Sequence, residues 1–179
     1  MNGRQRLETA MRRGVPDRVP VWCQLSAGHV DAHGLPNGRP PRNGEEGIVA
    51  ACNLTRRYRF DALFLGSVGL RPDKTPDGIE CMDPPPLGDV ELADAKRRIG
   101  SRIFLRGNLD SVNVLWRADE ETFVRNVRAT IEAGKPGGGY ILGTACSVAP
   151  EAPPERMARL VDMAEKWGTY PEAASPGGA

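Results

Sequence analysis

The sequence predicts an α/β protein whose strands form a parallel sheet. Short apolar segments alternate along the chain with longer amphipathic ones, and this alternation is typical of repeated βα units. Gly and Pro account for 21 and 16 of the 179 residues, and they gather in the stretches between those segments, where they mark loops. With 40% apolar and 26% charged residues, the chain has the composition of a globular domain with a core of its own.

Five apolar segments are expected to be strands: residues 19–25, 61–65, 79–82, 102–106 and 140–143. A closed (β/α)8 barrel needs eight strands and typically about 250 residues. The units therefore look like those of a barrel, but about five parallel strands are too few to close a standard one.

The expected helices follow from apolar periodicity and from capping residues. They cover residues 4–13, which Gly14 ends, residues 45–59, and residues 90–99 between an Asp89 cap and Gly100. Two more begin after Asp119 and at Pro154, each with an apolar stripe: Phe123, Val124, Val127 and Ile131 in the first, Met157, Leu160, Val161 and Ala164 in the second.

The remaining segments are expected to lack regular structure. Residues 26–43, rich in Gly, Pro and Asn, read as a loop, and residues 170–179 read as a disordered tail. One domain is expected over residues 1–169, with an N-terminal part at 1–70 and a C-terminal part at 76–169.

Charge and cysteine content exclude several classes of function. A formal net charge of +1 gives no strong attraction to nucleic acid or to an anionic membrane surface. No apolar run approaches the ~20 residues of a membrane helix, and the charged N-terminus does not look like a secretory signal, so a cytoplasmic location is expected. The four cysteines have no CxxC spacing, which argues against a disulfide framework or a local zinc knuckle, and each reads first as a buried apolar residue.

Ligands of parallel α/β folds gather beyond the carboxyl ends of the strands. The polar residues expected there are Ser26, His29, Ser67, Asp83, Asn108, Asp110, Thr144, Cys146 and Ser147. Each has a simpler interpretation: Asn108 and Asp110 could make turn hydrogen bonds, and His29 could be a solvated loop residue. The glycines at 137–139 match neither phosphate-binding pattern, and no hydrolase or metalloprotease motif is present.

Three blocks of the sequence have a recognisable pattern: DRVPVWCQLSAGHV at 17–30, the helix, strand and GNLD arrangement at 78–110, and the segment with GTACSVAP at 122–157; a weaker block covers 56–70. These blocks resemble the uroporphyrinogen decarboxylase superfamily, which joins that enzyme to cobalamin-dependent methyltransferases. The resemblance implies a TIM barrel. Because RPDKT at 71–75 stands where the family carries several βα units, it implies a partial (β/α)8 TIM barrel whose middle units are missing.

The resemblance also argues against uroporphyrinogen itself as the substrate. Leu25 and His29 stand where the decarboxylase has two arginines that bind substrate carboxylates, and losing guanidinium partners removes strong charge-assisted hydrogen bonds. Val68 stands at the position of the aspartate that holds the pyrrole nitrogens, and Cys146 at the position of a histidine.

In the methyltransferase branch a cysteine at the position of Cys146 is one of three zinc ligands, and the zinc activates a thiol that accepts a methyl group from methylcobalamin. The other two ligands lie in a His-x-Cys motif, which this chain lacks. The resemblance thus implies zinc, a corrinoid protein and a small-molecule substrate, with an incomplete metal site. The assigned residues are His29, Asn108 and Asp110 for catalysis, Trp22, Gln24, Ser26 and Ser67 for substrate binding, and Cys146 for metal.

Four interpretations stay open at this point. The chain could be a methyltransferase-like enzyme that is degenerate or depends on a partner, or a uroporphyrinogen decarboxylase of porphyrin biosynthesis. It could also be a non-catalytic remnant, or a homodimer in which two chains complete a sheet. Helix faces meant to cover eight strands would be partly uncovered, which predicts poor solubility or self-association.

Overall fold

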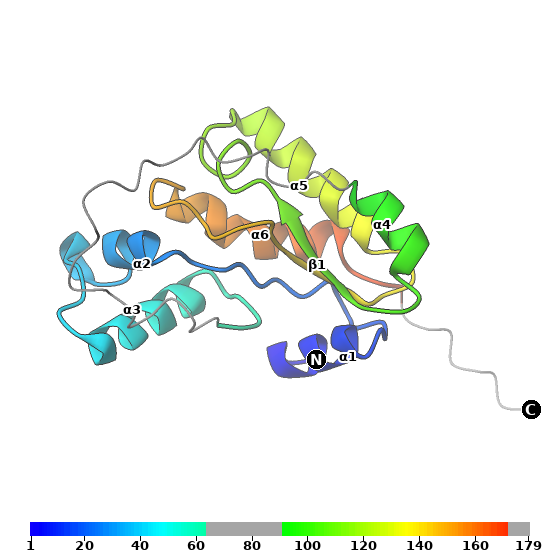
Figure 1. Ribbon diagram of the computed structural model, residues 1–179, viewed down its shortest axis with the longest axis horizontal. Helices are drawn as coiled ribbons and strands as arrows, with labels where there is room; N and C mark the ends of the chain where they lie inside the picture. The colour runs from blue at the N-terminus through cyan, green and yellow to red at the C-terminus, as the bar shows by residue number, and fades with distance from the viewer. Residues whose placement is uncertain (64–90, 172–179) are drawn as a thin grey trace, which may run out of the picture.

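The computed structural model describes residues 1–63 and 91–171, which form a small parallel sheet surrounded by helices (Figure 1). Its elements run in the order α1 (Gly3–Met11), α2 (Ala27–His33), the short 3-10 helix η1 (Pro36–Gly38), α3 (Gly44–Arg57), α4 (Leu92–Ile99), β1 (Leu105–Leu109), α5 (Glu120–Gly134), β2 (Tyr140–Thr144) and α6 (Pro154–Trp167). The predicted mixture of helices with parallel strands is therefore confirmed at this coarse level. Within the described ranges, none of the helices is both long and apolar enough to cross a membrane.

The strand β2 lies in the middle of the sheet. On one side it pairs in parallel with β1, with Leu105 opposite Tyr140 and Leu109 opposite Thr144. On its other side residues 19–25 run parallel to it through isolated bridges, and the Leu142 amide donates to the Pro20 carbonyl at 2.9 Å. Segments from the two ends of the chain therefore meet along one strand.

The strand predictions have mixed outcomes. Residues 140–143 are confirmed as β2, whereas the strand expected at 102–106 begins only at Leu105. The amides of Arg102 and Ile103 donate to the Ile99 carbonyl, so the chain continues to turn after α4. Residues 19–25 make bridges in place of a continuous ladder, and Pro20 has no amide hydrogen to contribute. The segments 61–65 and 79–82 lie wholly or partly outside the described residues.

Most helices begin and end near the predicted positions because local chemistry determines their ends. The Asp119 side chain accepts from the Thr122 amide at the start of α5, and Gly100 ends α4. Asp89 lies outside the described residues.

Two expectations about irregular segments are wrong. Residues 26–43 contain α2, because the Ser26 hydroxyl accepts from the His29 amide and caps a helical turn. The predicted tail starts too early, since the Tyr170 hydroxyl donates to the Lys135 carbonyl at 3.1 Å. Residues 172–179 lie outside the described part of the chain.

Helices cover the sheet unequally on its two sides. On one side α3, α5 and α6 bury a large core that includes Val21, Cys23 and Leu142. On the other, a small separate cluster joins Leu7 and Ala10 of α1 to Ile141 of β2. The strands thus lie between α1 and the α5–α6 layer, as Figure 1 shows.

A buried group of ions connects α1, the segment 19–25 and the segment that follows α3. The Asp61 carboxylate, 3% exposed, accepts from Arg18 at 2.8 Å, from Arg6 at 3.1 Å and from the Val21 amide at 2.8 Å. Arg6 also donates to Asp17, and this hydrogen bond is the main reason that the pKa of the Asp17 carboxyl lies well below its usual range. Because Asp61 bonds to both side chain and backbone, it sets the position at which the segment 19–25 begins.

We expect Asp61→Asn to lower the free energy of unfolding by about 3–5 kcal/mol, because it removes the buried counter-charge of Arg18 and leaves only the exposed Glu165 at 3.9 Å. Urea denaturation measures the change. Asp162→Asn, which removes an exposed partner of Arg59 on the surface, is the matched control and should cost less than about 1 kcal/mol. Equal losses in the two variants would show that Asp61 has no special structural role.

Candidate functional site

The two flanking strands of the sheet alternate between buried and half-exposed residues. Val21, Cys23 and Leu25 are buried, whereas Trp22 and Gln24 between them are half-exposed. In β1 the residues Gly107 and Leu109 are buried, and Arg106 and Asn108 are half-exposed. Since successive side chains of a strand point to opposite faces, the half-exposed side chains lie on the face opposite α5 and α6. We call this the open face: Trp22, Gln24, Arg106 and Asn108.

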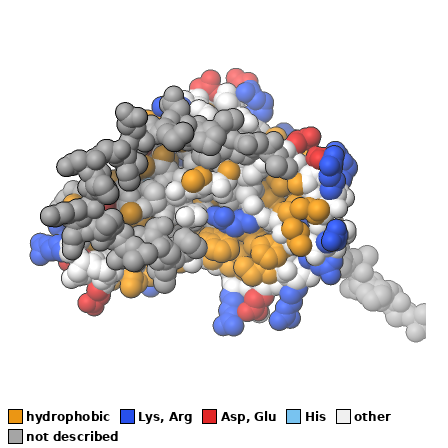
Figure 2. Space-filling view, viewed as in Figure 1, with side chains coloured by type: hydrophobic (Ala, Val, Ile, Leu, Met, Phe, Trp, Pro, Cys, Tyr) orange, Lys and Arg blue, Asp and Glu red, His pale blue; other side chains and the backbone are white. Residues whose placement is uncertain are grey.

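The side chain of Arg106 reaches across the open face from β1 to the segment 19–25. Its Nε donates to the Trp22 carbonyl at 3.2 Å, and its guanidinium carbon lies 4.9 Å from the centre of the Trp22 ring. It passes over Gly143 of β2, where a Cβ would come within 3.2 Å of the arginine Nε. Figure 2 shows basic and apolar side chains side by side near the middle of the face that carries β1 in Figure 1.

The open face brings together three of the residues assigned from the sequence and one that was missed. Trp22, Gln24 and Asn108 lie on it, although their roles in binding or catalysis stay predictions. Arg106 was read only as the end of a strand. The signal that could have found it is the alternation in LRGNL, which puts arginine and asparagine on one face.

At the carboxyl edge of the sheet, polar residues hold the local backbone. The Asp110 carboxylate accepts from the amides of Val112 and Asn113 at 2.8 Å each, so the turn interpretation is confirmed for this residue. Ser26 caps α2 as described above. Both side chains therefore have structural partners, and their assigned roles in catalysis and substrate binding stay predictions. Ser67, Val68 and Asp83 lie outside the described residues.

His29 is fully buried and uses both ring nitrogens, so its interpretation as a solvated loop residue is wrong. Nδ1 lies 3.1 Å from the Ala149 carbonyl and Nε2 lies 2.9 Å from the Tyr58 hydroxyl. A carbonyl only accepts, so Nδ1 carries the proton and Nε2 accepts from Tyr58. Burial lowers the pKa of the imidazole to about 4, which keeps the ring neutral at pH 7. The ring joins α2, α3 and the loop after β2, and a catalytic role stays a prediction.

The cysteines divide by environment. Cys23 is buried, as expected for an apolar residue, whereas Cys146 is exposed and Cys52 is half-exposed. The Cys146 sulfur lies 3.8 Å from the Ser147 hydroxyl. No three His, Cys, Asp or Glu side chains within residues 1–63 and 91–171 are grouped so as to hold a metal ion. The described donors therefore do not fit the zinc site that the resemblance implies, and Cys81 lies outside the described residues.

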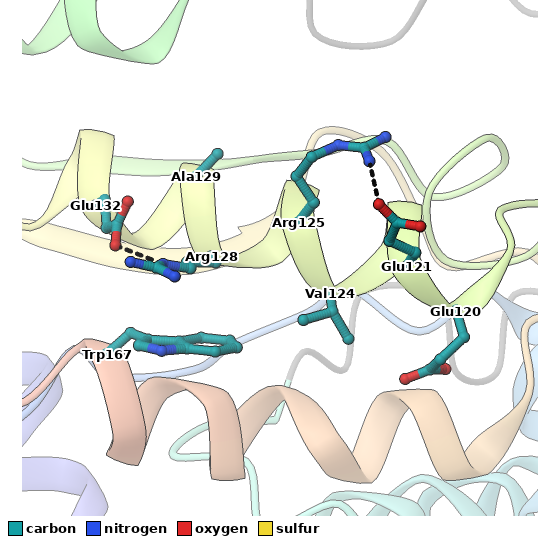
Figure 3. A pocket seen from close by; sticks show the side chains of 8 residues that line it. All are labelled: Glu120, Glu121, Val124, Arg125, Arg128, Ala129, Glu132 and Trp167. Carbon is teal, nitrogen blue, oxygen red and sulfur yellow. Dashed lines mark hydrogen bonds and ion pairs between the residues drawn. The ribbon is translucent and has the colours of Figure 1, made fainter.

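A groove of about 760 Å³ lies on the outer surface between α5 and the end of α6 (Figure 3). Its charged residues already pair with one another or with a neighbour: Glu120 with Arg159 at 2.6 Å, Glu121 with Arg125 at 3.5 Å, and Arg128 with Glu132 at 2.7 Å. Because these charges are compensated and the groove lies on the helix layer, the open face is the better candidate for a ligand site.

Comparison with known proteins finds similarity in the C-terminal half of the chain. Residues 88–167 match the family model described as Uroporphyrinogen decarboxylase (URO-D). A uroporphyrinogen decarboxylase of Thioalkalivibrio sulfidiphilus is 37% identical over 79 residues, which are 44% of this chain and 22% of that protein. The enzyme of the same name from Ruthia magnifica is 33% identical over 78 residues, again 44% and 22%. That of Methylibium petroleiphilum is 32% identical over 89 residues, 48% of this chain and 23% of the relative. The matched segment thus spans less than a quarter of the length of these relatives.

His29 should make stability depend on pH. Its folded pKa of about 4 lies below the ordinary value of about 6.5, so the unfolded chain takes up a proton first as the pH falls. Its contribution is complete above pH 6.5 and is lost progressively toward pH 4, on the order of 3 kcal/mol in total. Urea midpoints at pH 7 and pH 5 should differ less in His29→Gln than in the wild type. The comparison variant His33→Gln removes a less buried ring 4.8 Å away that also lowers the pKa of His29, so it should reduce the difference by less than His29→Gln does.

Proposed function

We propose, from the membership of residues 88–167 in the uroporphyrinogen decarboxylase superfamily, that this chain binds an acidic tetrapyrrole of the uroporphyrinogen type. The observation that carries the proposal is where the matched segment lies. It contains β1, β2 and the loops after them, and so it supplies the β1 half of the open face. The similar proteins from Thioalkalivibrio sulfidiphilus and Ruthia magnifica are named uroporphyrinogen decarboxylase.

The arrangement of the strands supports a finer proposal, that the sheet is an arc of a (β/α)8 barrel. In a closed barrel the first and the last strand must be neighbours. Here the segment 19–25, the first apolar segment, bridges in parallel to the last strand at Val21 and Leu142, and to the loop after that strand at Leu25 and Val148. The short segment 71–75, which would replace the middle units, lies outside the described residues.

We propose binding without efficient decarboxylation. Leu25 and His29, at the positions where the resemblance implies substrate-binding arginines, are both buried and offer no free donor to a ligand. The donors on the open face include the amide of Gln24 and the guanidinium of Arg106, and carboxylates accept from both. A polycarboxylated ring fits this set of donors.

The methyltransferase interpretation is the second candidate, favoured by one observation, the exposed sulfur of Cys146. Zinc would activate a thiol there, and a corrinoid protein would bring the methylcobalamin. Catalytic zinc needs about three protein ligands, and the described donors near Cys146 do not provide them. This candidate therefore depends on ligands from a partner or from residues outside the described part.

Uroporphyrin, the stable oxidised form of the ring system, should bind to the purified chain with a change in its absorbance and fluorescence. Gln24→Ala should weaken binding about three- to tenfold, the loss of one hydrogen bond to a charged acceptor. Asn53→Ala on α3, away from the open face, is the control and should bind as the wild type does.

Two results would contradict this proposal. One is the absence of uroporphyrin binding by the folded wild type. The other is turnover of uroporphyrinogen at the rate of a full-length relative, which would show that Leu25 and His29 do not impair the reaction.

The zinc content of the purified chain distinguishes the methyltransferase candidate from the tetrapyrrole-binding proposal. We expect the wild type and Cys146→Ser to retain equal, substoichiometric zinc after gel filtration, measured by plasma emission spectrometry. One zinc per chain in the wild type, lost in Cys146→Ser but kept in Cys52→Ser, would support the methyltransferase candidate.

A further inference from the structure

We propose that Arg106, supported by Trp22 and Gly143, is an anion-binding residue of the open face and takes a carboxylate of a polycarboxylate ligand. The inference names the residue that would hold the ligand, and it rests on the proposed function only for the identity of that ligand as a tetrapyrrole.

The first argument is the uncompensated charge of Arg106. Arg18 and Arg6, the other arginines that pack against the strands, pair with Asp61. Arg106 has no carboxylate within 4.0 Å among the residues that the structure describes. A half-buried guanidinium has lost part of its hydration. A bound anion would compensate this loss through an ion pair with the guanidinium.

The second argument is the orientation of the guanidinium. Its Nε is held by the Trp22 carbonyl at 3.2 Å, and its plane is held near the Trp22 ring at 4.9 Å. In the described part of the chain, Nη1 and Nη2 make no hydrogen bond. Two neighbouring N–H donors on a fixed fork are what a carboxylate binds in bidentate fashion. Because the side chain is already ordered, binding costs less conformational entropy than it would for a free surface arginine.

The third argument is the glycine beneath the arginine. Gly143 lies in the central strand, where glycine weakens a strand and gives no side chain to pack. A Cβ at this position would lie 2.6 Å from the Trp22 carbonyl oxygen and 3.2 Å from the Arg106 Nε. Glycine leaves room above β2 first for the Trp22 carbonyl and then for the Arg106 side chain that donates to it. The three residues therefore form one unit, which we call the Arg106 platform: Trp22, Arg106 and Gly143.

The surroundings of the Arg106 platform indicate the class of ligand. The indole of Trp22 lies beside the guanidinium and packs against the cluster of Leu7, Ala10 and Ile141, so it helps to hold Arg106 in place. Gln24 and Asn108 lie two residues further along the same strands and are neutral amides. Among the four described residues that define the open face, Arg106 carries a charge and none is Asp or Glu, so these residues favour an anion over a cation.

Benzene-1,3,5-tricarboxylate is a suitable probe, with the neutral benzene-1,3,5-tricarboxamide as its matched compound. Calorimetry measures the affinity, and the indole N–H resonance of Trp22 in heteronuclear NMR reports the place of binding. The wild type should bind the tricarboxylate and not the amide, with a shift at Trp22. Arg106→Gln should weaken binding at least tenfold and Arg106→Lys by less, since lysine keeps the charge but loses the fork. Arg102→Gln, an exposed arginine four residues earlier, should bind as the wild type does.

Gly143→Ala gives a second test that leaves every charge in place. The added methyl group should displace Arg106 from Trp22 and weaken binding of the tricarboxylate, with Arg106 itself unchanged. Circular dichroism and thermal melts establish that each variant folds. If Arg106→Gln does not fold, the dissociation constants of Arg106→Lys and the wild type are compared, and equal values would overturn the inference.

The inference is overturned if the folded wild type does not bind the tricarboxylate, if Arg102→Gln weakens binding as much as Arg106→Gln, or if Trp22 does not respond. It is also overturned if sedimentation shows a dimer that Arg106→Gln dissolves while the probe does not bind, because a carboxylate of a second copy would then be the partner. Tricarboxylate binding through Arg106 without uroporphyrin binding would refute the tetrapyrrole proposal and leave the Arg106 platform standing. Uroporphyrin binding that is unaffected by Arg106→Gln would support the tetrapyrrole proposal and refute the role of the Arg106 platform.

Discussion

The pairing of β2 with segments from both halves of the chain determines the rest of the described structure. Its Leu142 accepts from the Trp22 amide and donates to the Pro20 carbonyl, while its other side pairs with β1. All five residues of β2 are buried, because the strand has a neighbour along each edge and is covered on both faces. Because the two flanking strands are in register with it, β2 decides which of their side chains meet α5 and α6 and which form the open face.

Local chemistry explains which parts of this arrangement the sequence could predict. The Asp119 cap, the start of α6 at Pro154 and the apolar stripe of α5 depend on neighbours within four residues, and all three were predicted. The helix α2 was missed because its residues have weak helix propensity and its stability comes from a Ser26 cap and from buried His29. The role of Arg106 depends on a glycine 37 positions away in the chain, which no local pattern reveals.

The polar residues near the strands fall into two groups: those whose hydrogen bonds stabilise the fold, and those with donors that the described structure leaves unused. At the carboxyl edge, Ser26, His29 and Asp110 have their hydrogen bonds taken by the backbone or by Tyr58, and they stabilise helices, turns and loops. On the open face the Arg106 fork keeps donors that the described structure does not use. The similarity to the uroporphyrinogen decarboxylases covers β1 and β2 and therefore includes this arginine. The match to the family model and the unused donors of Arg106 point to the same side of the sheet.

The contacts between residues 19–29 and residues 140–149 also affect how the chain folds. His29 bonds to Ala149 across 120 residues, and residues 19–25 find their partner strand only after position 140 has been synthesised. Such high contact order slows folding, because loop closure must precede the stabilising contacts. During translation the apolar side chains of Val21, Cys23 and Leu25 are exposed until β2 has been synthesised. A nascent chain of this kind is a natural client for chaperones, and C-terminal truncation before β2 should leave it in aggregates.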